Sequence, residues 1–168
     1  MSTQALNISY LVDAVLQQLQ QREGSIYQVD LDILAKGLSA STYACHSHLA
    51  LCLADLQFLQ QLASAGKRQV TPAAVMTLLD AFAYGIKLNI SVHQQLLPAL
   101  PIQGLSVLPV ALSDQHGATI HLDTRALISY QHVAQLNGKW LVTPKLSLVT
   151  QLAKDYLVQR HIQLIKTE

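Results

Sequence analysis

The sequence predicts an α/β fold, with helices flanking a layered, mainly parallel sheet that contains one β-hairpin and with an amphipathic helix added at the N-terminus. Three observations carry this prediction. Short β-prone runs alternate with helical periodicity over most of the chain, which is typical of α/β layers. Residues 139–168 have the pattern of strand, helix and strand, a unit whose strands pair in parallel. Residues 1–24 have the periodicity of a helix that is apolar on one face.

Residues 1–24 form the first predicted element, the amphipathic helix. Residues 2–7 are polar and are expected to be irregular, so the helix would begin near Asn7 or Ser9 and end before Gly24. Its apolar positions recur at spacings of three and four residues. This apolar face consists of Ile8, Leu11, Val12, Val15, Leu16 and Leu19. The face could pack on the protein's own body or dock into a groove on another protein, and both alternatives stay open.

Residues 25–44 are predicted to be a linker or a short edge element, because Asp30 and Asp32 interrupt the apolar positions. The α/β domain is predicted to span residues 45–168. Its first elements are a buried strand over 49–53, a helix over 55–63, a polar break over 66–69, a helix from Thr71-Pro72 to Gly85, a strand over 86–92 and a short helix over 93–100. Thr followed by Pro favours a helix start, because Thr caps and Pro loses only an unpaired N–H.

The second half of this domain begins with a predicted hairpin, in which the turn-rich segment 113–117 joins strands over 105–112 and 118–122. The further elements expected are a strand over 126–128, a small helix over 129–136, a strand over 139–142, a helix that starts at Thr143-Pro144, and a final strand over 162–165. If that final strand is buried, removal of the C-terminal residues should be costly.

The composition bounds the class of protein. The chain has 168 residues, enough for one domain with a real core, and is 51% hydrophobic but only 12% charged. Either an oligomer partner or larger assembly covers its surface, or the surface is polar and uncharged. A net charge of +1 gives no electrostatic reason to expect that the chain binds nucleic acid. No apolar run is long enough for a membrane span, and no secretory signal or disulfide framework is visible, so we expect a cytosolic protein.

One metal site and one anion site can be considered. On an extended strand His46, His48 and Cys52 would share a face, a donor set that suits zinc. The spacing matches no standard zinc motif, so we predict no metal and no cofactor. Lys139 and Lys145 flank the expected helix start at Thr143, where backbone N–H groups could hold a phosphate. An ordinary capped helix explains the same residues, whereas a flavin- or nucleotide-binding protein is the rival that the anion site would support.

Catalytic motifs are missing from the sequence. The chain contains no G-x-S-x-G and no glycine-rich phosphate loop, and its carboxylates are isolated, so no acid–base pair is evident. These observations predict a protein that is not an enzyme.

Several segments resemble a known family. They are Ala83-Tyr84-Gly85-Ile86, residues 91–98, residues 114–117, residues 127–133 and the C-terminal residues 161–168. In these segments and in length the chain resembles the PduM family of the propanediol-utilisation bacterial microcompartment. The resemblance implies a structural component without catalytic residues, which serves assembly and integrity of the shell and links it to the core of coenzyme-B12-dependent diol dehydratase. It implies shell proteins or encapsulated enzymes as partners, with a homo-oligomer also open, and the N-terminal helix as an encapsulation peptide.

Overall fold

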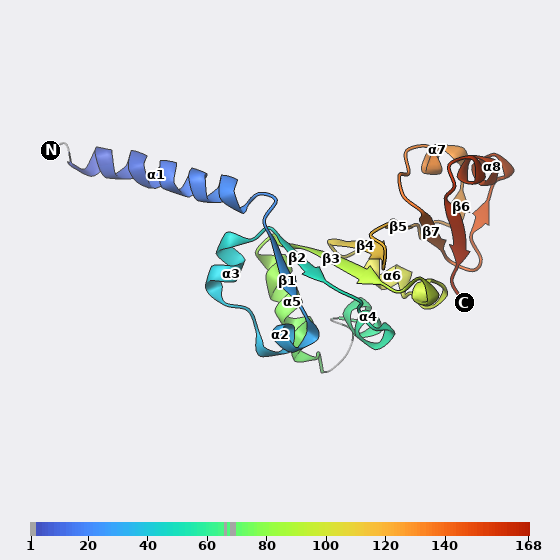
Figure 1. Cartoon of the computed structure of the whole chain (residues 1–168), viewed down its shortest axis with the longest axis horizontal. Helices are drawn as coiled ribbons and strands as arrows, with labels where there is room; N and C mark the ends of the chain where they lie inside the picture. The colour runs from blue at the N-terminus through green and yellow to red at the C-terminus, as the bar shows by residue number, and fades with distance from the viewer. Residues whose placement is uncertain (1–2, 66, 68–69) are drawn as a thin grey trace.

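A computed structural model describes residues 3–65, 67 and 70–168 of the chain. Its centre is a seven-stranded sheet in which the strands lie in the order of the sequence (Figure 1). These strands are β1 (Ile26–Val29), β2 (His48–Leu51), β3 (Lys87–Val92), β4 (Val110–Asp114), β5 (Thr119–Leu122), β7 (Trp140–Thr143) and β9 (Gln163–Lys166). Neighbouring strands pair in parallel except β4 and β5, which form the predicted hairpin. The α/β fold with a mainly parallel sheet is therefore confirmed.

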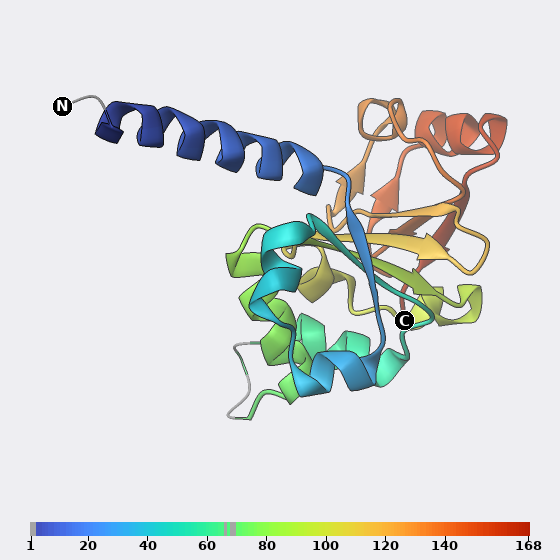
Figure 2. The ribbon, with the colours of Figure 1, turned by 60° about the vertical axis from the view of Figure 1, so that its left-hand side comes forward.

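The helices cover different faces of the sheet before and after the hairpin (Figure 2). The first set is α2 (Leu31–Lys36), α3 (Ala40–Cys45), α4 (Leu56–Ala63), α5 (Ala73–Ala83), the 3₁₀ helix η1 (Gln94–Ala99) and α6 (Ile102–Leu105). The second set is α7 (Tyr130–Val133) and α8 (Gln151–Gln159). Strand direction reverses at the hairpin while the strand order continues, and right-handed crossovers then place the later helices on the opposite face.

Two hydrophobic cores result from this arrangement. The larger core joins strands β1 to β5 to the first set of helices, and the smaller one joins β7 to α7 and α8. Trp140 and Val142 point into the larger core, whereas Leu141 between them points into the smaller one. All four residues of β7 are buried, as expected for a strand covered on both faces.

The N-terminal segments differ from the expectation in detail. Helix α1 spans Thr3–Arg22, so the helix includes residues that were expected to be irregular. Residues 25–44, expected to be a linker or an edge element, form the edge strand β1 and helices α2 and α3, and Leu34 is fully buried. Asp30 accepts a hydrogen bond from Ile33 N at 2.7 Å, so this carboxylate caps α2. Of the predicted polar break, residues 66, 68 and 69 lie outside the described residues.

Two boundaries in the second half were predicted wrongly. Leu105 belongs to α6, so β4 begins later than expected. The unit β7–α8–β9 is parallel as predicted, but α8 starts at Gln151 and Thr150 caps it. The short strand β8 (Leu148–Val149) pairs with β6 (Leu127–Ile128) and occupies the place of the expected first helical turns. This pairing outweighs the local preference of Thr143-Pro144 for a helix start.

Candidate functional site

The apolar face of α1 is the most exposed hydrophobic surface that the sequence singled out. Ile8, Leu11, Val12, Val15, Leu16 and Leu19 are each 50–64% exposed. None of them belongs to either core. The helix projects from the body and touches it only near its C-terminal end (Figure 1). Full burial of one such side chain stabilises a complex by about 1.5–3 kcal/mol, so this face has a large capacity for binding.

Arg22 holds the root of α1 against the body. Its Nε donates to the carbonyl oxygen of His46 at 3.0 Å, and its Nη2 donates to the carbonyl oxygen of Tyr84 at 3.0 Å. The acceptors belong to segments that follow α3 and α5, so one guanidinium ties the helix to two other helices. The Tyr84 ring in turn stacks on Tyr43 at a centroid distance of 4.9 Å. The last turn of α1 therefore has a defined attachment.

The side of α1 that faces the body is polar. A shallow groove of about 370 Å³ separates α1 from the end of α3, and it is lined by Ala14, Gln17, Gln18, Gln21, Arg22 and Cys45. With 3.6 residues per turn, Gln17 and Gln21 lie roughly opposite the apolar face, whereas Gln18 and Arg22 lie at its border. None of the six residues of the apolar face lines this groove, so the face is exposed and available to another molecule.

The structure removes the basis of the predicted anion site. Thr143 is the last residue of β7 and is fully buried, and no helix starts there. Lys139 places its ammonium 5.1 Å from the centre of the Trp140 ring, which is a cation–π contact. The carbonyl oxygen of Lys145 accepts from Lys166 Nζ at 3.4 Å. The flavin or nucleotide alternative depended on a helix N-terminus at this position, and it loses that support.

The cysteine and histidine residues considered for zinc lie in different environments. His46 follows α3 and its ring packs against Tyr27 at 5.1 Å, whereas His48 begins β2 and contacts Ser47 Oγ at 2.9 Å. Cys52 follows β2 and its thiol donates to Gln28 Oε1 at 3.7 Å. They do not share one strand, because β2 spans only His48–Leu51, with His46 before it and Cys52 after it. Among the described residues no three acidic, histidine or cysteine side chains gather at one point.

Asp114 is a buried carboxylate that the sequence did not single out. It accepts hydrogen bonds from Trp140 Nε1 at 2.9 Å and from the backbone N–H groups of His116 and Ala118, both at 2.8 Å. Burial alone would raise the pKa of Asp114, but these three bonds and the nearby Lys139 outweigh it and hold the pKa below the ordinary value. Because its partners all satisfy the charged form, Asp114 fastens the hairpin to β7. In the sequence, only the turn-rich pattern of residues 114–117 pointed to Asp114.

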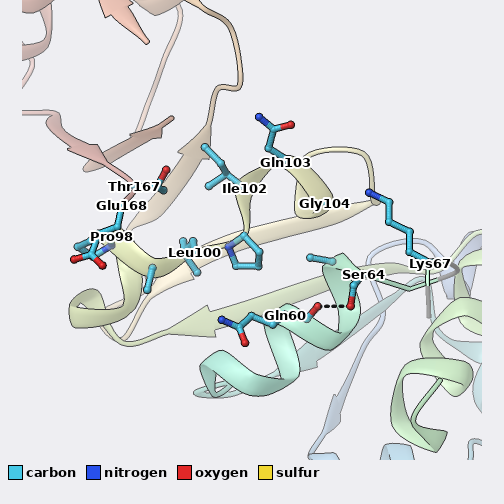
Figure 3. Close-up of a pocket in the computed structure, with 13 residues that line it drawn as sticks. Gln60, Ser64, Lys67, Pro98, Leu100, Ile102, Gln103, Gly104, Thr167 and Glu168 are labelled. Atoms are coloured by element: carbon cyan, nitrogen blue, oxygen red, sulfur yellow. Dashed lines mark hydrogen bonds between the residues drawn. The ribbon is translucent and has the colours of Figure 1, made fainter. Parts of the chain in front are cut away.

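One of the pockets of the body lies between α4, η1, α6 and the C-terminal residues (Figure 3). It has a volume of about 550 Å³, and Leu100 and Ile102 supply part of its apolar wall. Lys67 and Glu168 line it at opposite ends (Figure 3), and Ser64 donates its hydroxyl hydrogen to the carbonyl oxygen of Gln60 at 2.7 Å. The polar groups do not converge, so the pocket lacks the arrangement of an acid–base or phosphate site.

No described helix combines the length and the apolarity that crossing a bilayer would require.

Comparison with known proteins identifies the relatives of this chain. A family model described as "Putative propanediol utilisation" matches residues 10–163. A bacterial microcompartment assembly protein PduM of Salmonella typhimurium (strain LT2) is 34% identical over 158 residues, which cover 94% of this chain and 95% of that protein. The protein of the same name from Citrobacter freundii is 36% identical over 159 residues, again 94% and 95% of the two chains. No solved structure matches the chain significantly. The match of the family model and the identity along nearly the whole length show that this chain belongs to the PduM family of propanediol-utilisation proteins.

Proposed function

We propose that this protein is a non-enzymatic assembly protein of the propanediol-utilisation microcompartment, that it resides in that compartment, and that it links the shell to the enzyme core. The names of both relatives support the assembly role. The lack of convergent polar groups in the pocket of Figure 3 agrees with a role in binding. The linking role is our own extension, and α1 is the part of the molecule on which it depends.

The observation that carries the proposal is the direction of the apolar face of α1. A helix that an ordinary domain uses for its own stability turns its apolar side toward the core. Here residues 8–21 are all exposed; the glutamines line the groove beside the end of α3, and Val15 and Leu19 lie outside that groove. An amphipathic helix presented in this way fits a hydrophobic groove on a shell protein or an encapsulated enzyme, with side chains one turn apart as anchors.

The proposal is tested by the double variant Val15→Asp, Leu19→Asp. Two carboxylates in the apolar face should abolish co-purification of the protein with isolated microcompartments, because a charge cannot enter an apolar groove unpaired. The fold should be unchanged, because neither side chain contributes to a core. Thermal unfolding of the purified variant checks that point.

A matched control places the same charges on the other side of the same helix. The double variant Tyr10→Asp, Gln17→Asp alters residues outside the apolar face, and Tyr10 is exposed as well. This control should co-purify like the unaltered protein. If the Val15 and Leu19 variant also co-purified normally, α1 would not be the docking element.

A further inference from the structure

A second groove lies at the edge of the sheet that is farthest from α1. It runs between α8 and β9 and has a volume of about 640 Å³. Its lining includes Lys154, Leu157, Val158, His161 and Leu164. Helix α1 leads into β1 at one edge of the sheet, and β9 forms the opposite edge (Figure 1). The two surfaces are therefore at opposite ends of the molecule.

The backbone of β9 is open on the side away from β7. Gln163 N donates to Lys139 O at 2.7 Å and Thr167 N donates to Thr143 O at 2.9 Å, so these residues point their N–H groups toward β7. Backbone groups alternate along a strand, and Leu164 and Lys166 consequently direct theirs to the other side. Among the described strands none pairs with that side of β9. An open edge of this kind is a template for an added strand.

The side chains next to this edge form an apolar strip. Leu164 packs against the smaller core on the α8 side of the sheet, and Leu157 of α8 is buried beneath the groove. Val158 is 74% exposed on the α8 wall of the groove. A groove between an edge strand and a helix binds extended peptides, since the strand supplies backbone hydrogen bonds and the groove takes alternate side chains.

The charges of the groove select the kind of occupant. Its titratable lining residues are Lys154 and His161, both basic. Two copies that packed groove to groove would bring their Lys154 and His161 side chains together, and like charges repel one another. The same charges attract an acidic segment. A second copy of this chain is therefore disfavoured relative to an acidic strand of another protein.

We infer that this groove binds an extended segment of another protein, in which apolar residues alternate with acidic ones and which adds to the sheet beside β9. The inference goes beyond the proposed role of α1, because it concerns other elements and another mode of recognition. If the linking role holds, α1 and the groove supply the two ends of the link.

The test uses the purified full-length protein and a synthetic peptide of alternating valine and glutamate. Saturating peptide should slow hydrogen exchange of the Leu164 and Lys166 amides several-fold, because these groups would become bonded. The counterpart with lysine in place of glutamate should have no such effect. Val158→Asp should weaken binding by about tenfold, which corresponds to about 1.4 kcal/mol. Since no microcompartment is needed, a negative result here is separate from failure of the α1 proposal.

The matched control is Leu152→Asp, which makes the same kind of change at an exposed residue of α8 outside the groove. It should bind the glutamate peptide like the unaltered protein. Unchanged exchange at Leu164 and Lys166, or equal slowing by both peptides, would overturn the inference. Slowing that depends on protein concentration without peptide would also overturn it, because the occupant would then be a second copy.

Discussion

Thr143 contains a buried hydroxyl group whose oxygen has no hydrogen-bond partner among the described residues. The residue is fully buried at the end of β7. An unsatisfied buried polar group costs about 1–3 kcal/mol. Thr143→Val keeps the shape of the side chain and removes the hydroxyl, so we expect the free energy of unfolding in urea to rise by about 1 kcal/mol. Thr143→Ser is the control that keeps the hydroxyl and should not stabilise. A lower stability of the valine variant would contradict this account.

Asp114 should make the stability depend on acid pH. Its pKa is lowered in the folded state, so its contribution is present above the ordinary carboxyl pKa of about 3.9 and is lost as the pH falls through the folded value. Asp114→Asn removes the charge that accepts from Trp140 and should cost about 1–3 kcal/mol at neutral pH. Urea unfolding at pH 7 and pH 3 should show a smaller difference between the two proteins in acid. An equal difference at both values would exclude this role of the charge.

Contacts between residues that are far apart in the chain could not be predicted from the sequence. The turn 114–117 could be recognised from the sequence, but its bond to Trp140 depends on how β4, β5 and β7 lie in the sheet. Arg22 lies in the last turn of α1, where a cation suits the helix dipole. Its acceptors are the backbone carbonyls of His46 and Tyr84, which have no signature in a sequence because every residue has a carbonyl.

Helices α4 and α6 approach each other so closely at Gly104 that a glycine is required there. A Cβ atom at Gly104 would lie 2.3 Å from the carbonyl oxygen of Ala63. Gly104→Ala must therefore separate α4 from α6, and we expect a loss of about 1–3 kcal/mol in urea unfolding. Gln103→Ala, at an exposed residue of the same short helix, should change stability by less than about 0.5 kcal/mol. Equal effects of the two substitutions would show that the close contact is unimportant.

The elements that were predicted well are those with strong local patterns. The hairpin has a turn-rich loop between two apolar runs, and α1 has a long amphipathic period, so both follow from near neighbours in the chain. The segment 143–150 was predicted wrongly because its structure depends on a distant partner: Leu148 N donates to Ala126 O at 2.7 Å and Thr150 N donates to Ile128 O at 3.0 Å. The segment 25–44 was ambiguous because the aspartate that caps α2 looked like an interruption of the apolar pattern.

At the scale of the whole molecule, the reversal of strand direction at the hairpin divides the protein into two cores on opposite faces of one sheet. The face of β1 to β4 that is opposite to the larger core carries Gln28, Ala50, Asn89 and Ala111 in register, and all are at least partly exposed. Uncharged polar and small side chains thus account for part of the low charge content. The exposed apolar face of α1 accounts for another part.

The candidate site also shows what a sequence can predict. The six apolar residues of α1 were found from periodicity alone. How α1 is attached to the body, through Arg22 and beside the end of α3, is a property of the assembled fold that the local sequence pattern does not contain.

Site-specific photo-crosslinking in intact microcompartments tests the central claim most directly. A crosslinking residue at Leu16 lies in the apolar face of α1, whereas one at Gln17 lies on the side of the groove beside α3. We predict that position 16 crosslinks to a shell protein or an encapsulated enzyme and that position 17 reacts mainly within the same chain. Crosslinks from position 16 to the protein's own body, or none to any microcompartment protein, would contradict the account.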